Sequence, residues 1–204
     1  MKKIRKGEYG YRTGFKKKHI FLISVLAVFI IAQLAARYFT DSQAVKNILT
    51  VMAIVTVLPA ANLASPLVAI IKYKTPSKEF YEKYSVYEEK FPMLFDMVLT
   101  TKDYVLPMDA VAVHPTGIYA YCINPKVNIH EAEKSLNEIL VSQRLDPNMK
   151  ITGELSTFDK RLKSLNPVSE YEDDGSVEYA VNTMKSLGME ENDKAVRKQE
   201  RCRL

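Results

Sequence analysis

The chain has 204 residues, 26% of them charged, and a net charge of +5 at neutral pH. About 130 residues remain after the apolar segments near the N-terminus, which suffice for one domain of ordinary size and exclude a second. The two cysteines, Cys122 and Cys202, lie too far apart in the sequence for a zinc pattern or a disulfide framework. Unpaired thiols of this kind are typical of a reducing cytoplasm.

A basic leader, residues 1–18, begins the chain. It has one acidic residue, Glu8, against eight basic ones: Lys2, Lys3, Arg5, Lys6, Arg12, Lys16, Lys17 and Lys18. Because this block directly abuts an apolar segment, membrane topology and anionic lipid headgroups explain it better than nucleic acid does. We expect the leader to be cytoplasmic and to lie against anionic headgroups.

Two apolar segments within residues 19–73 predict a transmembrane helical hairpin. Residues 20–36 would span about 26 Å and residues 48–71 about 36 Å, against a hydrocarbon core of about 30 Å. A cleaved signal peptide is the alternative for the first segment, since small residues stand near its end. The long leader and the second span that soon follows favour an uncleaved anchor.

The distribution of Lys and Arg predicts the orientation. The leader has eight such residues, whereas the loop 37–47 has only Arg37 and Lys46. Four lysines follow the second span at positions 72, 74, 78 and 83. Positive charge accumulates on the cytoplasmic side of membrane proteins. We therefore expect a multi-pass plasma membrane protein with both termini in the cytoplasm.

Polar residues within the spans are few. Gln33 lies in the first span, and Asn62 lies between Pro59 and Pro66 in the second. A kinked helix is expected, with Asn62 near Gln33 or on the face of a homo-oligomer. A gate or transport site is the other interpretation, but two spans cannot enclose a pore unless the chain oligomerises.

The first half of residues 77–188 predicts a helix followed by a short sheet. An amphipathic helix is expected over 77–90, with four aromatic residues on one face. Strands are expected over 93–99, 109–113 and 118–123, and a His114-Pro-Thr-Gly117 turn joins the last two.

The second half of this region predicts helices that cover the sheet. Helical spacing continues over 129–143, a strand over 149–152 follows, and another helix ends before Pro167. A last helix is expected over 177–187, and the charged tail 189–204 is expected to be disordered. The fold class is therefore a small α/β (α+β) domain, with helices packed on a short mixed sheet.

Residues 107–124 resemble the nuclease-related domain (NERD), a branch of the PD-(D/E)xK nuclease superfamily. In that family an Asp opens a strand, a turn with Pro and Gly follows, and the next strand ends in Glu-x-Lys. The resemblance implies a restriction-endonuclease-like fold and places Asp109 on the metal-binding Asp. Cys122 and Asn124 stand where the family has Glu and Lys. One hard carboxylate beside a soft thiol is a poor magnesium site, so the resemblance implies an inactive domain without metal or cofactor.

Two carboxylates could in principle restore such a site. Glu131 and Glu133 follow on the next helix, and Lys126 could replace the missing Lys. The alternative is that Glu131, Glu133 and Lys134 are ordinary exposed helix residues. Asp109 also has a structural interpretation, since Asp after Pro-Met can cap a turn.

Three hypotheses for the function follow. The first is a membrane-anchored cytoplasmic interaction or regulatory module that is not an enzyme and binds an unknown protein partner. The second is a residual metal-dependent nuclease that uses Asp109 with Glu131 or Glu133. The third is a small membrane-complex subunit that acts through its two spans, with homo-oligomerisation through the same helices.

Overall fold

The protein is described by a computed structural model that covers residues 4–101, 104–172 and 174–188. The chain divides into two units by its internal contacts. One is formed by Met1–Arg12 together with Lys74–Leu204, and the other is Thr13–Tyr73. Residues 4–12 of the predicted leader therefore belong to the same unit as the predicted α/β domain, and this unit is called the soluble unit from here on. The predicted tail lies outside the described residues.

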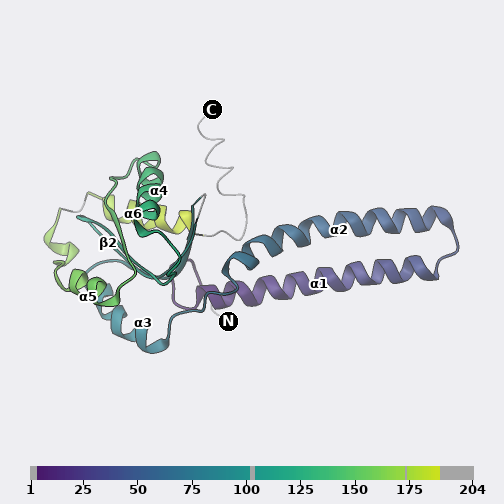
Figure 1. Cartoon of the computed structure of the whole chain (residues 1–204), viewed down its shortest axis with the longest axis horizontal. Coiled ribbons are helices and arrows are strands. Elements are labelled where there is room, and N and C mark those ends of the chain that lie inside the picture. The colour runs from purple at the N-terminus through teal and green to yellow at the C-terminus, as the bar shows by residue number, and fades with distance from the viewer. Residues whose placement is uncertain (1–3, 102–103, 173, 189–204) are drawn as a thin grey trace. The chain divides into compact units, whose positions relative to one another are not determined.

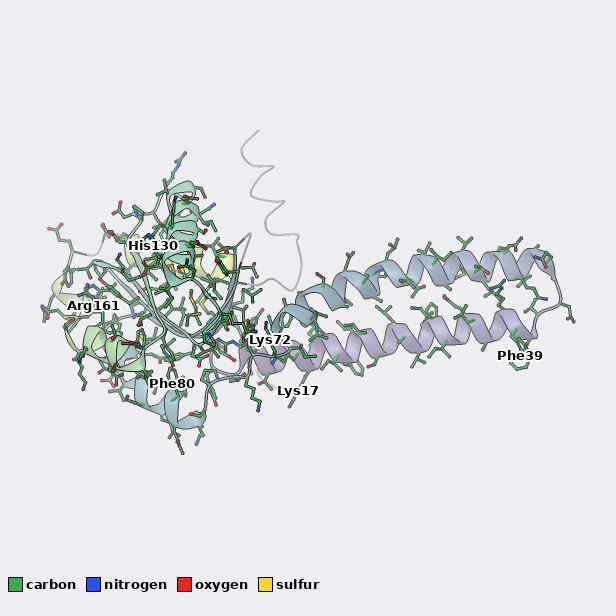
Figure 2. The ribbon with its side chains drawn as sticks, in the orientation of Figure 1. Lys17, Phe39, Lys72, Phe80, His130 and Arg161 are labelled. Carbon is green, nitrogen blue, oxygen red and sulfur yellow. The ribbon has the colours of Figure 1, made fainter. Side chains whose placement is uncertain are left out.

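The unit Thr13–Tyr73 is a helical hairpin of α1 (Tyr11–Phe39), which starts two residues before the unit, and α2 (Gln43–Ile70). Both helices are long and apolar enough to cross a membrane, by length and composition. Figure 2 shows that the side chains along the hairpin are mostly hydrocarbon. α1 begins nine residues before the predicted apolar segment, because the end of the leader is helical as well. Lys16 Nζ donates to the carbonyl of Ile71 at 3.0 Å and also to that of Tyr73, which satisfies acceptors beyond the end of α2.

The other unit is a four-stranded mixed sheet with helices on both faces. Its sheet order is β1-β2-β3-β4, antiparallel except that β4 runs parallel to β3. Figure 1 shows α4 and α6 on one face and α3 and α5 on the other. The elements in chain order are α3 (Lys78–Ser85), the 3₁₀ helix η1 (Val86–Glu89), β1 (Met93–Thr100), β2 (Val105–His114), β3 (Gly117–Cys122), α4 (Ile129–Ser142), β4 (Met149–Thr152), α5 (Leu155–Lys163), the 3₁₀ helix η2 (Val168–Glu170) and α6 (Ser176–Leu187).

Each face of the sheet has its own apolar core. The face under α4 and α6 is mainly aliphatic, with Leu136 and Met184 fully buried against Val111 of β2. The face under α3 and α5 is aromatic, and Tyr84, Phe95 and Phe158 are buried in it. Because both faces are covered, β1 and β2 are buried along nearly their whole length. The predicted helices and the α/β character of this region are confirmed.

Side chains of α4 form hydrogen bonds with the backbone along the outer edge of β4. Asn137 accepts from the Met149 amide at 2.9 Å and donates to its carbonyl at 3.2 Å, as a neighbouring strand would. Glu133 Oε1 accepts from the Ile151 amide at 2.7 Å. These bonds leave no free backbone donor at Met149 or Ile151 for an added strand.

The leader and the end of α6 cover the outer edge of β1. The Phe95 amide donates to the carbonyl of Gly7 at 2.8 Å, and Leu99 forms a bridge with Gly188. Gly7 has a φ of +83°, which favours glycine, and a Cβ there would approach Leu94 Cδ2 to 2.8 Å, so a larger residue would also require Leu94 to shift. The described part of the sheet therefore has neither edge open.

Candidate functional site

Two aspartates face each other where the regular pairing of β1 and β2 is interrupted. The pairs Phe95–Ala110 and Met97–Met108 flank this point, so Asp96 and Asp109 stand opposite each other. Asp96 has a φ of +56°, and Asp109 is an extra residue in β2 relative to β3. A residue other than glycine in this conformation costs free energy and persists only where the surroundings hold it in place.

The interruption reverses the direction of the side chains in both strands. Phe95 and Ala110 pack on the aromatic face, whereas Met97, two residues after Phe95, and Met108, two residues before Ala110, pack on the aliphatic face. In a regular strand, residues two positions apart share a face. Each strand therefore contains one extra residue that breaks the alternation of side chains between the two faces of the sheet. In both strands this residue is an aspartate.

The side chain of Arg12 joins these aspartates. Its Nη1 lies 2.7 Å from Asp109 Oδ1, and its Nε lies 3.0 Å from Asp96 Oδ1 in an ion pair that lacks the alignment of a hydrogen bond. Its remaining donors bond the carbonyl oxygens of Lys74, Met97 and Met108 at 2.7–2.9 Å. Five oxygen acceptors therefore surround one guanidinium, and every nitrogen of the group faces an acceptor.

Asp96 has further partners on its second oxygen. Its Oδ2 accepts from the Arg12 amide and from Thr75 Oγ1, both at 2.9 Å. Arg12 and Asp96 are fully buried, and Asp109 is 7% exposed. Burial raises the pKa of both carboxyl groups, and the Arg12 guanidinium opposes that rise. One positive charge faces two carboxylates, so the cluster holds its cation strongly.

The three degenerate candidates of the sequence lie in the same region, but their side chains have different partners. Cys122 pairs with Met108, next to Asp109, and burial raises the pKa of its thiol. A buried, protonated thiol is neither a good metal ligand nor a nucleophile. Asn124 instead donates from Nδ2 to the Val105 carbonyl at 3.2 Å and accepts from the Lys126 amide. Asp109 lies within β2 rather than at the start of a strand, because β2 begins at Val105.

The carboxylates proposed as replacements have other partners. Glu131 accepts a hydrogen bond from the Tyr104 hydroxyl at 2.5 Å. Glu133 binds the edge of β4 through the Ile151 amide. Lys126 is exposed. Among the described residues, no group of three or more His, Cys, Asp or Glu side chains could hold a metal ion.

The polar residues of the hairpin also differ in their environments. Gln33 is buried and donates from Nε2 to Thr56 Oγ1 at 3.5 Å, a long hydrogen bond. Asn62 is exposed on α2. Gln33 therefore bonds Thr56 and not Asn62, the partner that was expected within the hairpin.

Comparison of the chain with protein-family models, with curated proteins and with solved structures finds no match in any of the three. The site must therefore be interpreted from its own geometry.

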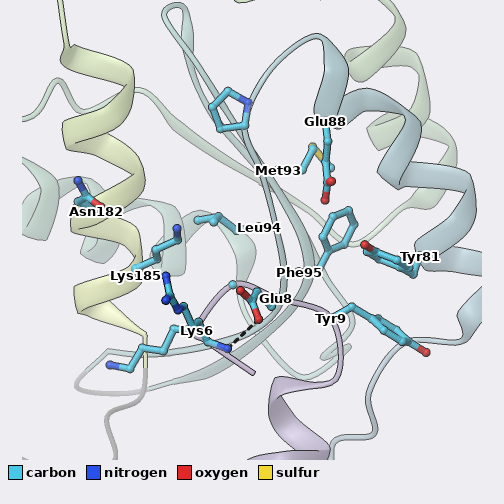
Figure 3. A pocket seen from close by; sticks show the side chains of 13 residues that line it. Lys6, Glu8, Tyr9, Tyr81, Glu88, Met93, Leu94, Phe95, Asn182 and Lys185 are labelled. Atoms are coloured by element: carbon cyan, nitrogen blue, oxygen red, sulfur yellow. Dashed lines mark hydrogen bonds between the residues drawn. The ribbon is translucent and has the colours of Figure 1, made fainter. Parts of the chain in front are cut away.

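A pocket with a volume of about 740 Å³ lies beside the leader. Figure 3 shows Tyr9 of the leader next to Tyr81 of α3, and the two rings stack at 4.6 Å between centroids. Charges of both signs line the pocket, including Lys6, Glu8 and Lys185. This mixture selects no class of ligand, and the pocket shows that the leader packs loosely between its contact points.

Arg12 and Asp96 are the site residues that the sequence interpretation missed. Arg12 was counted as one of eight leader cations, although it is buried in the sheet. Asp96 stands in the otherwise apolar run Met93–Thr100. A single carboxylate in a strand that is apolar on both sides requires a buried partner, and that signal was available.

Proposed function

We propose that the protein is a membrane-anchored interaction or regulatory module whose nuclease-like domain is not catalytic. In this proposal α1 and α2 span the membrane and the soluble unit lies in the cytoplasm, where it binds a protein partner. The order of helix, three strands, helix and strand agrees with the elements that the NERD resemblance implies, which supports a restriction-endonuclease-like fold.

The observation that carries the proposal is the ion pair between Arg12 and Asp109. In the family that the sequence resembles, this Asp would bind a divalent metal ion. Here a guanidinium lies 2.7 Å from it and is itself held by four further acceptors. A metal ion would have to displace a buried cation that is part of the fold, and Glu131 and Glu133 are engaged elsewhere.

The division of the chain supports a common side for both ends of the hairpin. Residues before α1's apolar segment and residues after α2 form one unit, so the segment between them must cross a membrane an even number of times. The excess of Lys and Arg beside the spans then favours the cytoplasm as that side.

A nuclease assay on the full-length protein in detergent tests the proposal. We expect no cleavage of single- or double-stranded DNA or RNA with Mg²⁺ or Mn²⁺. Cleavage that depends on metal and is abolished by Asp109→Ala would refute it. An Arg5→Ala variant is the matched control, because Arg5 is an exposed leader arginine whose side chain lies outside the cluster.

The Arg12→Ala variant extends this test. If the guanidinium alone excludes a metal ion, this variant should bind Mn²⁺ through Asp96 and Asp109, as measured by electron paramagnetic resonance, and still cleave nothing. Cleavage by Arg12→Ala would support the residual-nuclease hypothesis instead, with Arg12 as its inhibitor.

A further inference from the structure

Arg12, Asp96, Asp109 and Thr75 form a group that is called the Arg12 cluster here. This cluster joins the two points where the chain leaves and re-enters the soluble unit. Arg12 is the last residue before the hairpin unit, and Lys74 is the first residue after it. Arg12 Nη1 donates to the Lys74 carbonyl at 2.9 Å, and Thr75 Oγ1 donates to Asp96 at 2.9 Å. Both ends of the hairpin are therefore bound to the same buried group of charges.

The same cluster is also bound to the irregular point of the sheet. The guanidinium bonds the backbone carbonyls of Met97 and Met108, on either side of the opposed aspartates. Asp96 keeps a φ of +56° there, which the surrounding contacts must maintain. A displacement of Arg12 relative to Lys74 would therefore act on β1 and β2 at their irregular point, beside Asp96 and Asp109.

With α1 and α2 spanning the membrane, as proposed above, the hairpin is subject to the thickness of the bilayer. The apolar segment of the first span, residues 20–36, is about 26 Å long, whereas that of the second span, residues 48–71, is about 36 Å long. Against a hydrocarbon core of about 30 Å, the first is too short and the second too long. A change in thickness thus acts on the two helices in opposite senses and shifts their linked ends relative to each other.

We propose that the Arg12 cluster is a mechanical latch that transmits bilayer thickness from the hairpin to β1 and β2. The stimulus is the lipid bilayer, and the response is the local opening of the sheet around Asp96 and Asp109. The inference rests on the proposed spanning of the membrane by α1 and α2, and it does not depend on the absence of catalysis.

Amide hydrogen exchange of the full-length protein tests the latch. The protein is reconstituted in dimyristoleoyl- or dierucoyl-phosphatidylcholine vesicles, and exchange is measured by mass spectrometry over β1 and β2. We expect rates over residues 93–100 to differ about fivefold between the two bilayers, because local opening governs exchange. Residues 149–152 of β4 should exchange equally in both, and Arg5→Ala should behave as the wild type.

Chemical rescue distinguishes two roles of the Arg12 side chain: its covalent link to α1 and its occupation of the cavity beside Asp96 and Asp109. In Arg12→Ala, added ethylguanidinium should occupy the cavity and restore protection of β1 without a covalent link to α1. The difference between the bilayers should then shrink to about twofold or less, with the remainder due to the Arg12 backbone amide and the other leader contacts. An undiminished difference in the rescued variant, or no difference in the wild type, would overturn the latch.

A charge-neutral variant covers the case in which ethylguanidinium does not restore protection. Arg12→Met with Asp96→Asn and Asp109→Asn removes the guanidinium and both buried charges together. Its exchange rates over residues 93–100 should differ between the two bilayers by about twofold or less, and a response equal to that of the wild type would reject the proposal. Surface labelling of Ser42→Cys in the same vesicles distinguishes a failure of the latch from a hairpin that does not span.

Discussion

Arg12 donates a hydrogen bond to the carbonyl oxygen of Lys74 at 2.9 Å, across 62 positions of the sequence. The residues that flank the hairpin unit are therefore in direct contact within the soluble unit. A fragment that starts at Ser77 would lack Arg12 and leave Asp96 and Asp109 buried without their cation. Experiments on this unit consequently require the leader as well as residues 74–188.

Removal of the Arg12 guanidinium should strongly destabilise the soluble unit. We expect Arg12→Met to lower the free energy of unfolding by about 3–5 kcal/mol, because it leaves two buried carboxylates without a partner. Cys122 is buried, and its reaction with a thiol reagent in a Cys202→Ser background reports opening of the unit. Arg5→Met should change the labelling rate little, and equal effects of the two substitutions would contradict the structure.

Replacement of Asp109 should cost less than replacement of Arg12. Asp109→Asn keeps an oxygen that can accept from Arg12 and removes the excess negative charge, so the remaining pair of Arg12 and Asp96 is balanced. We expect a loss of about 1 kcal/mol or less in the same labelling assay. A loss as large as that of Arg12→Met would show that Asp109 contributes more than charge compensation.

Glu133 should stabilise the edge of β4 rather than act as a ligand. Glu133→Ala leaves the Ile151 amide without its acceptor and should cost about 1–2 kcal/mol of unfolding free energy. Glu133→Gln retains an acceptor oxygen and should cost less. Glu138→Ala, an exposed position on the same helix, serves as the control and should change stability by about 0.5 kcal/mol or less.

His114 should make the soluble unit less stable in mild acid. Its Nε2 donates to the Asn166 carbonyl at 3.0 Å and its Nδ1 accepts from the Thr116 amide at 3.2 Å, so the imidazole is neutral. Burial lowers the pKa of His114 from 6.5, and the nearby Arg161 adds to this effect. The unfolded chain therefore binds the proton first, and stability falls as the pH drops below about 6.5.

Thermal unfolding followed by near-ultraviolet circular dichroism measures this dependence. Stability should fall from pH 7 towards acid in the wild type, and the fall should be smaller in His114→Gln. The difference between the two proteins isolates His114 from Asp96 and Asp109, whose raised pKa values act in the opposite direction over their own titration range. A parallel pH profile in both proteins would contradict the prediction.

Labelling of introduced cysteines tests the proposed topology. Ser42 lies between α1 and α2 and is exposed, so Ser42→Cys should react with a membrane-impermeant reagent in intact cells. Glu138→Cys, on the soluble unit, should react only after permeabilisation. Reaction of Glu138→Cys in intact cells would place the soluble unit outside.

The elements of the soluble unit were predicted well from the sequence where one periodicity of apolar residues, helical or strand-like, covers the whole segment. The strand over residues 149–152 has the observed bounds, and the helix predicted over 129–143 ends one residue earlier, at Ser142. Both segments are short and flanked by turn residues, so local pattern and tertiary structure agree.

The candidate site was predicted only in part, because its geometry depends on contacts between distant segments. The interruptions at Asp96 and Asp109 compensate each other, so the register of β1 and β2 is the same on both sides of this point. The lengths of the two strands therefore do not reveal the interruption. Arg12 was assigned to the leader because basic residues beside an apolar segment usually serve topology. Its burial becomes evident only when the leader is placed against β1.

The split of the soluble unit into two segments of the chain also bears on biosynthesis. Residues 4–12 leave the ribosome before the hairpin, but β1 and β2, which bind them, are made after it. A chain whose second helix failed to return through the membrane would hold its leader and its sheet on opposite sides. Asp96 and Asp109 would then lack their cation, and the unit would stay open to proteolysis. Under the proposed topology, this ion pair would therefore form only in a chain whose hairpin was inserted correctly.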